Sequence, residues 1–347
     1  MRLMILILSH FAQDITVVRL TRVLQDQGQE FLVLDPTAMG REVSLALDGQ
    51  GPSCILRVGG RTFELSQLKS AWLWRSWQRF HDEPGLTELA ARPADWNFFR
   101  AEWRSFHKSL VLALKYSNTF CVNPAPMGGA AEEKCGQLLV AAQCGLRIPR
   151  SLYTAKLSLA REFIHSQGGK GIYKPFTSYV DLKDVHDLAS ARVARLYTNR
   201  VQEEDLEERD GLIPSPGIFQ PYVEKSLELR IVVVGEKVFA CAIHSQQNER
   251  GRSDWRRAVN QSVQYEPYSL PAEIEEKLLL LMRRLQLVFG SVDMIVTPEG
   301  EYVFLEVNPA GQFDWIAHFG RLPIYECLAA MLVAGRTNYT VPAAHAA

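Results

Sequence analysis

The sequence lacks most of the features that mark secreted, metal-binding and membrane proteins. Its six cysteines form no C-x-x-C pair, and its eight histidines form neither H-E-x-x-H nor H-x-H, so zinc sites and disulfide frameworks are poor interpretations. Apolar runs such as residues 3–8 and 278–282 are far shorter than the roughly 18 residues that a membrane span needs. The first run is also too short for a signal peptide, and polar residues follow it at once. We expect a cytoplasmic protein with reduced thiols and no transmembrane helix.

A strong net charge is also lacking. The 347 residues include 38 Lys and Arg against 39 Asp and Glu, a formal net charge of −1. No global basic field is available to neutralise a nucleic-acid backbone, so we expect no nucleic-acid partner. Hydrophobic residues make up 47% of the chain, which is typical of a globular protein with a large core. At roughly 100 to 200 residues per domain, the length indicates two or three domains.

The order of periodic segments predicts an α/β beginning. An apolar strand at residues 3–8 precedes an amphipathic helix at 14–28 and a second strand at 31–35. Next come a hairpin at 54–65, turning at two glycines, and a helical stretch at about 84–115. Strands and one long helix at 271–289 fill the C-terminal part. We therefore predict the α/β (α+β) class, without repeats or low-complexity tracts.

Breaks in this pattern predict three domains in series. A run rich in proline and glycine at residues 123–129 ends the first helical region. We place an N-terminal α/β domain at residues 1–125, a central subdomain at 126–212 and a C-terminal subdomain at 213–347.

The most specific local feature is a hairpin that carries acids near the C-terminus. If Glu299–Gly300 is a two-residue turn, Asp293 lies directly opposite Glu306, and Asn308 shares that face of the sheet. Carboxylates so placed repel each other unless a cation lies between them, and hard oxygen ligands suit Mg²⁺ shared with substrate phosphates. The alternative is a solvated hairpin face with incidental acids.

Two cations upstream fit the magnesium interpretation. Lys174 ends a strand that follows a glycine-rich stretch, and Arg230 projects with Glu228 from a strand whose other face is apolar. Glycine-rich backbone, two cations and an acidic hairpin together are typical of a site for a nucleoside triphosphate and Mg²⁺. An isolated Lys-Pro pair would be weak evidence on its own.

In order and rough spacing, these motifs resemble those of the ATP-grasp ligases across about residues 125–335. The residues that carry the resemblance are Lys134, Tyr173 to Pro175, Phe219 to Val223, Glu228 to Ile231, Val292 with Asp293, and Glu306 to Pro309. Within that superfamily the chain looks closest to the microviridin-type peptide maturases, the graspetide synthetases. That closer likeness rests on Leu196 to Thr198, Leu227 to Arg230, Ile243 to Gln246, and Asp254 to Arg256. The resemblance implies an ATP-grasp fold with an N-terminal pre-ATP-grasp domain.

The resemblance also implies a function in the biosynthesis of ribosomally made, modified peptides (RiPPs). A ligase of this kind activates a side-chain carboxylate of a precursor peptide as an acylphosphate. A hydroxyl or amine of the same peptide then displaces phosphate and closes an ester or amide macrocycle. Two alternatives stay open: a glutamate-adding ligase that acts on a protein tail or small amino acid, and a non-catalytic, nucleotide-dependent peptide-binding module.

Carried over residue by residue, the resemblance assigns contacts with ATP and Mg²⁺. Lys134 and Lys174 would bind ATP phosphates, and Arg230 would stabilise the transferring phosphoryl group. The implied magnesium ligands are Asp293, Glu306 and Asn308.

The implied adenine hinge runs through Gln220, Tyr222 and Val223, and Glu228 is implied near the ribose or the metal. Pro221 stands where the family usually has a glutamate. Since the adenine contacts there are mostly main-chain, a proline carbonyl still accepts a hydrogen bond.

Two further segments are implied to contact the peptide. Asp254 and Arg256 match a D-x-R element that would face the acceptor carboxylate, which a guanidinium binds with two parallel hydrogen bonds. The acidic run that includes Glu203, Glu204 and Asp205 is implied to bind the leader segment of the precursor, although such a run is usually a solvated helix face.

The tryptophans near residue 75 favour a structural interpretation. Trp72, Trp74 and Trp77 recur at strand spacing, as aromatic residues of a core or of a homodimer interface do. We therefore keep a homodimer among the expectations.

Overall fold

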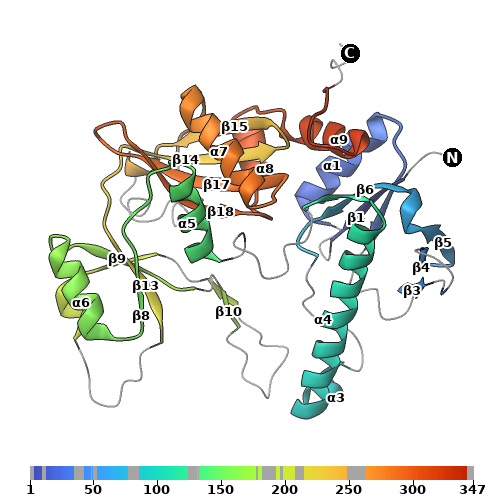
Figure 1. The fold of residues 1–347 in the computed structure, drawn as a ribbon, viewed down its shortest axis with the longest axis horizontal. Helices are drawn as coiled ribbons and strands as arrows, with labels where there is room; N and C mark the ends of the chain where they lie inside the picture. Colours follow the sequence, from blue (N-terminus) through green and yellow to red (C-terminus); the bar gives the residue numbers. More distant parts are fainter. Residues whose placement is uncertain are drawn as a thin grey trace.

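The computed structural model describes most of the chain. The described residues are 4–9, 13–34, 43–47, 49, 53–76, 86–123, 131, 133–176, 179–181, 193–195, 198–207, 215–247 and 263–341. In Figure 1 a small sheet lies at the left, a large sheet at the top centre and the N-terminal sheet at the right. Within the described residues, no helix is both long and apolar enough to cross a membrane.

The N-terminal sheet is parallel. Its order is β2 (Phe31–Leu34), β1 (Met4–Leu8), β6 (Leu68–Leu73) and β7 (Phe120–Val122). The helix α1 (Ile15–Asp26) joins β1 to β2, and the Asp14 side chain caps it by accepting from Thr16 N at 2.8 Å. The order β1, α1, β2 confirms the predicted α/β beginning. Every residue of β1 is buried, as expected for a parallel strand covered on both faces.

A three-stranded sheet and two helices complete the first third of the chain. The strand order of this sheet is β3 (Val43–Leu47), β4 (Cys54–Val58) and β5 (Arg61–Glu64), and the short η2 (Leu65–Gln67) follows β5. The predicted two-glycine turn joins β4 to β5, with positive φ at Gly59 and Gly60. The helical stretch predicted for about residues 84–115 is confirmed over the described residues 86–116, with one break. It is divided into α3 (Leu86–Ala90) and α4 (Pro93–Tyr116), since proline favours the first turn of a helix over its interior.

The small sheet of the middle region is antiparallel. Its order is β12 (Asn199–Val201), β9 (Gly171–Lys174), β13 (Gly217–Pro221) and β8 (Leu152–Thr154). The helix α6 (Leu157–Ser166) covers one face of this sheet. Its Ile164 packs with Phe219 of β13 and with Leu206 of the short η4 (Glu203–Leu206). A separate pair, β10 (Tyr179–Asp181) and β11 (Val193–Arg195), lies between these strands in sequence.

The large sheet is antiparallel and has five strands. Its order is β16 (Tyr265–Tyr268), β15 (Lys237–Ile243), β14 (Leu227–Val234), β17 (Phe289–Val296) and β18 (Tyr302–Asn308). The helices α5 (Lys134–Gln143) and α7 (Ala272–Arg284) cover one face, and η5 (Ser245–Gln247) follows β15. The helix predicted for 271–289 is too long, because Gln286 adopts a positive φ of 56° and ends it.

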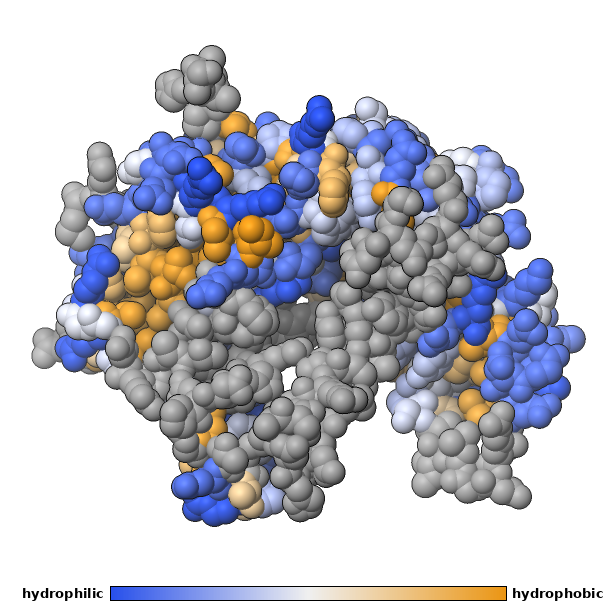
Figure 2. All heavy atoms as spheres, turned by 180° about the vertical axis from the view of Figure 1, so that it is seen from behind, coloured by the Kyte–Doolittle hydropathy of each residue, from blue (hydrophilic) through white to orange (hydrophobic). Residues whose placement is uncertain are grey.

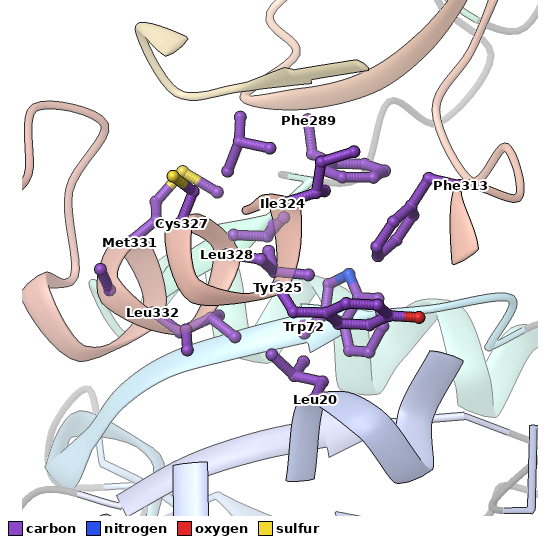
Figure 3. Packing of buried hydrophobic residues seen from close by; sticks show 14 of the residues in the cluster. Leu20, Trp72, Phe289, Phe313, Ile324, Tyr325, Cys327, Leu328, Met331 and Leu332 are labelled. Atoms are coloured by element: carbon purple, nitrogen blue, oxygen red, sulfur yellow. The ribbon is translucent and has the colours of Figure 1, made fainter. Parts of the chain in front are cut away.

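The opposite face of the large sheet reaches the N-terminal sheet through one continuous core. Helices α8 (Asp314–Phe319) and α9 (Ile324–Ala334) lie there, and α9 packs against α1 and β6. Figure 3 shows Leu20 and Trp72 of the N-terminal region meeting Phe289, Phe313 and residues of α9. Trp72 and Trp74 are buried there with stacked rings, which confirms the core interpretation for both; Trp77 lies outside the described residues.

Candidate active site

A row of three charged side chains crosses the large sheet. Arg230 of β14 pairs in register with Asp293 of β17, and Asp293 pairs with Glu306 of β18. Residues paired across neighbouring strands project to the same face. The predicted opposition of Asp293 and Glu306 is confirmed, and Arg230 joins them.

The turn that produces this register differs from the predicted one. Thr297 N donates to Glu301 O at 3.0 Å, so three residues and not two connect the strands. A register shift between Asp293 and Met294 then adds one residue on β18 and restores the opposition with Glu306. The bulge and the longer loop compensate for each other, so a wrong turn still gave the right pair.

Arg230 is fixed from two sides. Its Nη1 donates to Asp293 Oδ1 at 2.8 Å, and its Nη2 donates to Gln312 O at 2.9 Å. The side chain is 8% exposed and that of Asp293 is 15% exposed, so water screens this ion pair less than a surface pair. The buried Nε has no hydrogen-bond partner among the described residues, which leaves one guanidinium donor unsatisfied.

The two predicted lysines lie where the small and large sheets approach each other. Lys134 begins α5, and its Nζ lies 3.3 Å from Pro175 O and 3.9 Å from Glu306 Oε2. Lys174 is the last residue of β9 and directly precedes that proline. Lys134 therefore connects the end of β9 to the acid of β18, and the structure brings Lys134 to the charged row, with Lys174 next to its contact Pro175 in sequence.

Glu228 is enclosed by protein groups. Its Oε1 accepts from Ser245 Oγ at 2.6 Å and lies 2.8 Å from Lys225 Nζ. The carboxylate lies on the same strand as Arg230, two residues earlier, with its side chain 8% exposed. A buried carboxylate needs such partners to offset the loss of water. They fix Glu228 beside the row.

A pocket of about 370 Å³ opens beside the predicted adenine hinge. Tyr222 lines it together with Lys170, Arg200 and Lys225, and the Arg200 guanidinium lies 4.1 Å from the centre of the Tyr222 ring. Gln220 is buried, with its amide donating to Ser151 Oγ at 2.8 Å, and Val223 follows in the loop. An aromatic ring and several cations can bind a base and an anionic group.

The donor set of the row fits a hard cation. Two carboxylates, from Asp293 and Glu306, and the nearby carboxamide of Asn308 supply oxygen ligands of the kind that Mg²⁺ prefers. Asn308 pairs in register with Ser291, and its Oδ1 accepts from Ala310 N at 3.0 Å. The described residues contain no group of three or more His, Cys, Asp and Glu side chains placed to hold a metal.

Of the two segments expected to contact a peptide, the structure describes only the acidic run, which lies away from the charged row. Glu203, Glu204 and Asp205 form the short helix η4, where Glu203 contacts His165 Nδ1 at 2.9 Å and Asp205 accepts from Gln202 N at 2.8 Å. They belong to the small-sheet region and not to the charged row. Asp254 and Arg256 lie outside the described residues.

Three residues that the sequence did not single out hold the site together. Gln137 on α5 exchanges two hydrogen bonds with the main chain of Val307, donating at 2.8 Å and accepting at 2.9 Å. Buried Asn123 bonds Phe289 and Pro309. The Gln312 side chain bonds the start of α1. The only sequence signal is that Gln137 lies one helical turn after Lys134, so both share a face.

Comparisons with known proteins agree with this geometry. The RimK-like ATP-grasp domain matches residues 193–329. An ATP-grasp ligase associated with RiPPs, from Chryseobacterium gregarium, is 28% identical, with a TM-score of 0.81 over 97% of this chain and 99% of that one. It was solved with ADP and with a leader and core peptide. The macrocyclase MdnC from Microcystis aeruginosa MRC, solved with its precursor peptide MdnA, is 29% identical, with a TM-score of 0.77 over 95% and 99%.

A third structure shares the fold. PsnB, solved with Mg, ADP and a phosphomimetic variant of its minimal precursor, is 20% identical, with a TM-score of 0.72 over 96% of this chain and 99% of that one. No match was found among curated protein sequences. The resemblance read from the motifs is confirmed, as is the ATP-grasp fold with α/β architecture. Residues 193–329 match the RimK-like ATP-grasp domain, and the chain is similar along nearly its whole length to ATP-grasp ligases associated with ribosomally made peptides.

Proposed function

We propose that the protein uses ATP and Mg²⁺ to close ester or amide macrocycles in a ribosomally made precursor peptide. The observation that carries this proposal is the row of Arg230, Asp293 and Glu306 on one face of the large sheet. A guanidinium beside two convergent acids can bind a triphosphate together with its metal. The similar ligases of known structure act as precedents, since they hold ADP or precursor peptides.

We assign the contacts with phosphate, Mg²⁺ and adenine to different residues. Lys134, Lys174 and Arg230 would hold phosphate oxygens, and the buried, unsatisfied Nε of Arg230 marks donor capacity beyond its two protein contacts. The magnesium ligands would be Asp293, Glu306 and Asn308. Bound Mg²⁺ supplies charge neutralisation on the phosphate oxygens. The pocket lined by Tyr222 lies beside the hinge where Gln220 and Val223 would contact adenine, with Glu228 fixed nearby.

The reaction balances as two displacements. A side-chain carboxylate oxygen of the peptide attacks the γ-phosphorus, the bond to the bridging oxygen breaks, and ADP leaves with that electron pair. A hydroxyl or amine of the same peptide then attacks the acyl carbon, loses its proton, and expels inorganic phosphate. Each ring therefore makes the peptide lighter by one water. Asp254 and Arg256 are proposed to orient the acceptor carboxylate, and Glu203, Glu204 and Asp205 to bind the leader.

The test is single-turnover mass spectrometry with a precursor peptide encoded beside the gene. Peptide that loses one water per ring, together with one ADP for each water lost, is the expected result. Phosphorylated peptide trapped when the nucleophile is replaced would place the acylphosphate before ring closure. ATP consumption without any loss of peptide mass would contradict macrocyclisation.

The same experiment distinguishes the alternatives. A glutamate-adding ligase would yield a heavier, joined product when offered free amino acids, and a non-catalytic module would bind nucleotide and peptide without producing ADP. The chain favours catalysis, because a peptide-binding module has no need for two convergent acids beside Arg230 and Lys134.

Three expectations stay predictions beside this function. Cytoplasmic location agrees with the six cysteines, all of them without disulfide bonds. A homodimer agrees with half-exposed apolar side chains such as Ile15 and Val18 of α1, and Figure 2 shows an apolar area on the side that carries the N-terminal sheet. Sedimentation velocity tests self-association, and limited proteolysis tests the boundaries proposed after residues 125 and 212.

A further inference from the structure

Residues 309–312 directly follow the hairpin of β17 and β18. Each of their four main-chain carbonyls accepts a hydrogen bond from a side chain. Two of the donors come from the carboxyl ends of strands β6 and β7 in the N-terminal sheet, and two come from the large sheet. The contacts are Asn123 Nδ2 to Pro309 O at 3.0 Å, Arg75 Nε to Ala310 O at 3.4 Å, Ser291 Oγ to Gly311 O at 3.0 Å and Arg230 Nη2 to Gln312 O at 2.9 Å. We call residues 309–312 the clamp segment.

Gln312 connects this segment to the first helix of the chain. Its Nε2 donates to Asp14 Oδ2 at 3.0 Å, and its Oε1 accepts from Thr16 Oγ1 at 2.9 Å. Asp14 is also the N-cap of α1, with its other oxygen accepting from Thr16 N at 2.8 Å. The amide of Gln312 therefore has a donor and an acceptor contact on one rigid element.

The segment lies directly against the arginine. A Cβ atom at Gly311 would stand 2.6 Å from Arg230 Nη2 and 2.6 Å from Ser291 Cβ, so only glycine permits this approach. The next residue, Phe313, is fully buried, with its ring 5.8 Å from Trp74 and 5.4 Å from Phe289. Such packing fixes the backbone on both sides of the Gln312 carbonyl.

We propose that Gln312 is a positioning residue through which the N-terminal domain sets the direction of the Arg230 guanidinium. The side chain of Gln312 holds α1, its carbonyl holds Nη2, and Asp293 holds Nη1. With both terminal nitrogens fixed, the remaining guanidinium edge has one orientation toward a phosphoryl group. The inference rests on the proposed phosphoryl-transfer function, and it gives the N-terminal domain a part in that function.

An exchange of the two partner side chains tests this arrangement. In Gln312→Glu, a carboxylate faces the Asp14 carboxylate and the contact becomes repulsive. Adding Asp14→Asn restores one donor and one acceptor, and asparagine caps a helix as well as aspartate does. Gln29→Glu is the matched control, because it makes the same chemical change in a loop between α1 and β2.

We expect Gln312→Glu to lower the turnover number for ATP at least about tenfold, with the ATP dissociation constant changed less than about threefold. Amide hydrogen exchange in peptides that cover residues 309–313 should become faster. The double variant should recover both the exchange protection and most of the turnover, whereas Gln29→Glu should match the wild type.

Each result bears on the inference separately from the proposed function. Fast exchange in the single variant without recovery in the double variant would overturn the pairing with Asp14. Wild-type turnover in Gln312→Glu would overturn the positioning role. If the wild type converts no ATP, the proposed function fails and with it the positioning role. The exchange data, which need no turnover, would still report the Gln312 contact.

Discussion

The N-terminal sheet and the large sheet bury their residues in different ways. Strand β1 is apolar throughout and wholly buried, because apolar side chains cover both faces of that parallel sheet. Strand β14 is just as buried, yet it carries Glu228 and Arg230 on the face opposite Leu229 and Ile231. Burying such charges is unfavourable unless each has partners, and both do. Buried charge therefore separates the chemical region from the supporting one.

This difference predicts that substitutions in the two sheets have opposite signatures. In the N-terminal sheet a lost side chain should lower the stability of the fold and leave the chemistry of the folded molecules intact. In the charged row a substitution that keeps the shape should leave the fold stable and stop the chemistry. The two signatures should mix where the sheets are connected, as they are through Gln312.

The largest expected effect on stability is at Trp72. Its ring is 1% exposed and stacks on Trp74 at 4.9 Å. Trp72→Ala should lower the free energy of unfolding by about 3 to 5 kcal/mol, because it removes buried area and leaves a cavity. Urea unfolding measures the change, and Phe98→Ala, on the exposed side of α4, should stay within about 0.5 kcal/mol. A small loss at Trp72, or an equal loss at Phe98, would break the contrast.

The next effect concerns the chemistry of the large sheet. Glu306→Gln keeps the shape of the side chain and removes one charge from the row, so ATP turnover should fall at least about 100-fold, or about 3 kcal/mol. The unfolding midpoint should hardly move. Glu299→Gln, at the exposed turn of the same hairpin, serves as the control and should keep full turnover. An unchanged rate in Glu306→Gln with an intact fold would remove the hairpin from the mechanism.

Local patterns predicted much of the fold and of the charged row. The apolar run of β1 indicates a strand buried on both faces, and the alternation of β14 fixes the faces of that strand. The opposition of Asp293 and Glu306 was predicted correctly for an incomplete reason. A hydrophobic pattern does not reveal a β-bulge, and the three-residue turn happened to compensate for it. The strand β3 was missed although Val43, Leu45 and Leu47 alternate with smaller residues, because a run of five residues is ambiguous.

Contacts between distant residues could not be predicted in this way. Gln312 and Asp14 are separated by 298 positions, and Asn123 and Pro309 by 186. Nothing near either partner marks the pair, because an amide that bonds a helix cap looks like any surface glutamine in the sequence. The break of the helix after α3 was missed for a simpler reason, since Pro93 tolerates a helix start and was placed in an interior.

A buried histidine on α4 makes the stability of the N-terminal region depend on pH. Burial lowers the pKa of His107 from 6.5 to about 4, while its Nε2 lies 3.1 Å from Ser76 Oγ. The unfolded chain then binds more protons between these two values, so stability falls as the pH drops from about 6.5 toward 4. From pH 7 to pH 5 this group should cost about 2 kcal/mol.

The measurement is urea unfolding at both pH values for the wild type and for His107→Gln. The variant should lose about 2 kcal/mol less than the wild type over this range, whereas His318→Gln, on the exposed side of α8, should follow the wild type. Equal pH dependence of all three proteins would mean that His107 takes up its proton in the folded state.

The smallest expected effect is on leader binding by the acidic run of η4, which lies outside the large sheet. In η4, Glu204 is exposed and Glu203 is half-buried beside His165, while Leu206 anchors the turn in the core of the small sheet. If this run attracts a cationic leader, changing both acids to lysine should weaken leader binding several-fold at low salt and much less at high salt. ATP affinity should not change, since the charged row is elsewhere.

The matched control changes Glu275 and Glu276 to lysine on α7, which covers the other face of the large sheet. Fluorescence anisotropy with a labelled leader at two salt concentrations measures the difference. Equal affinity of the wild type and both variants would make the acidic run a solvated surface, and buried charge alone would then mark function in this chain.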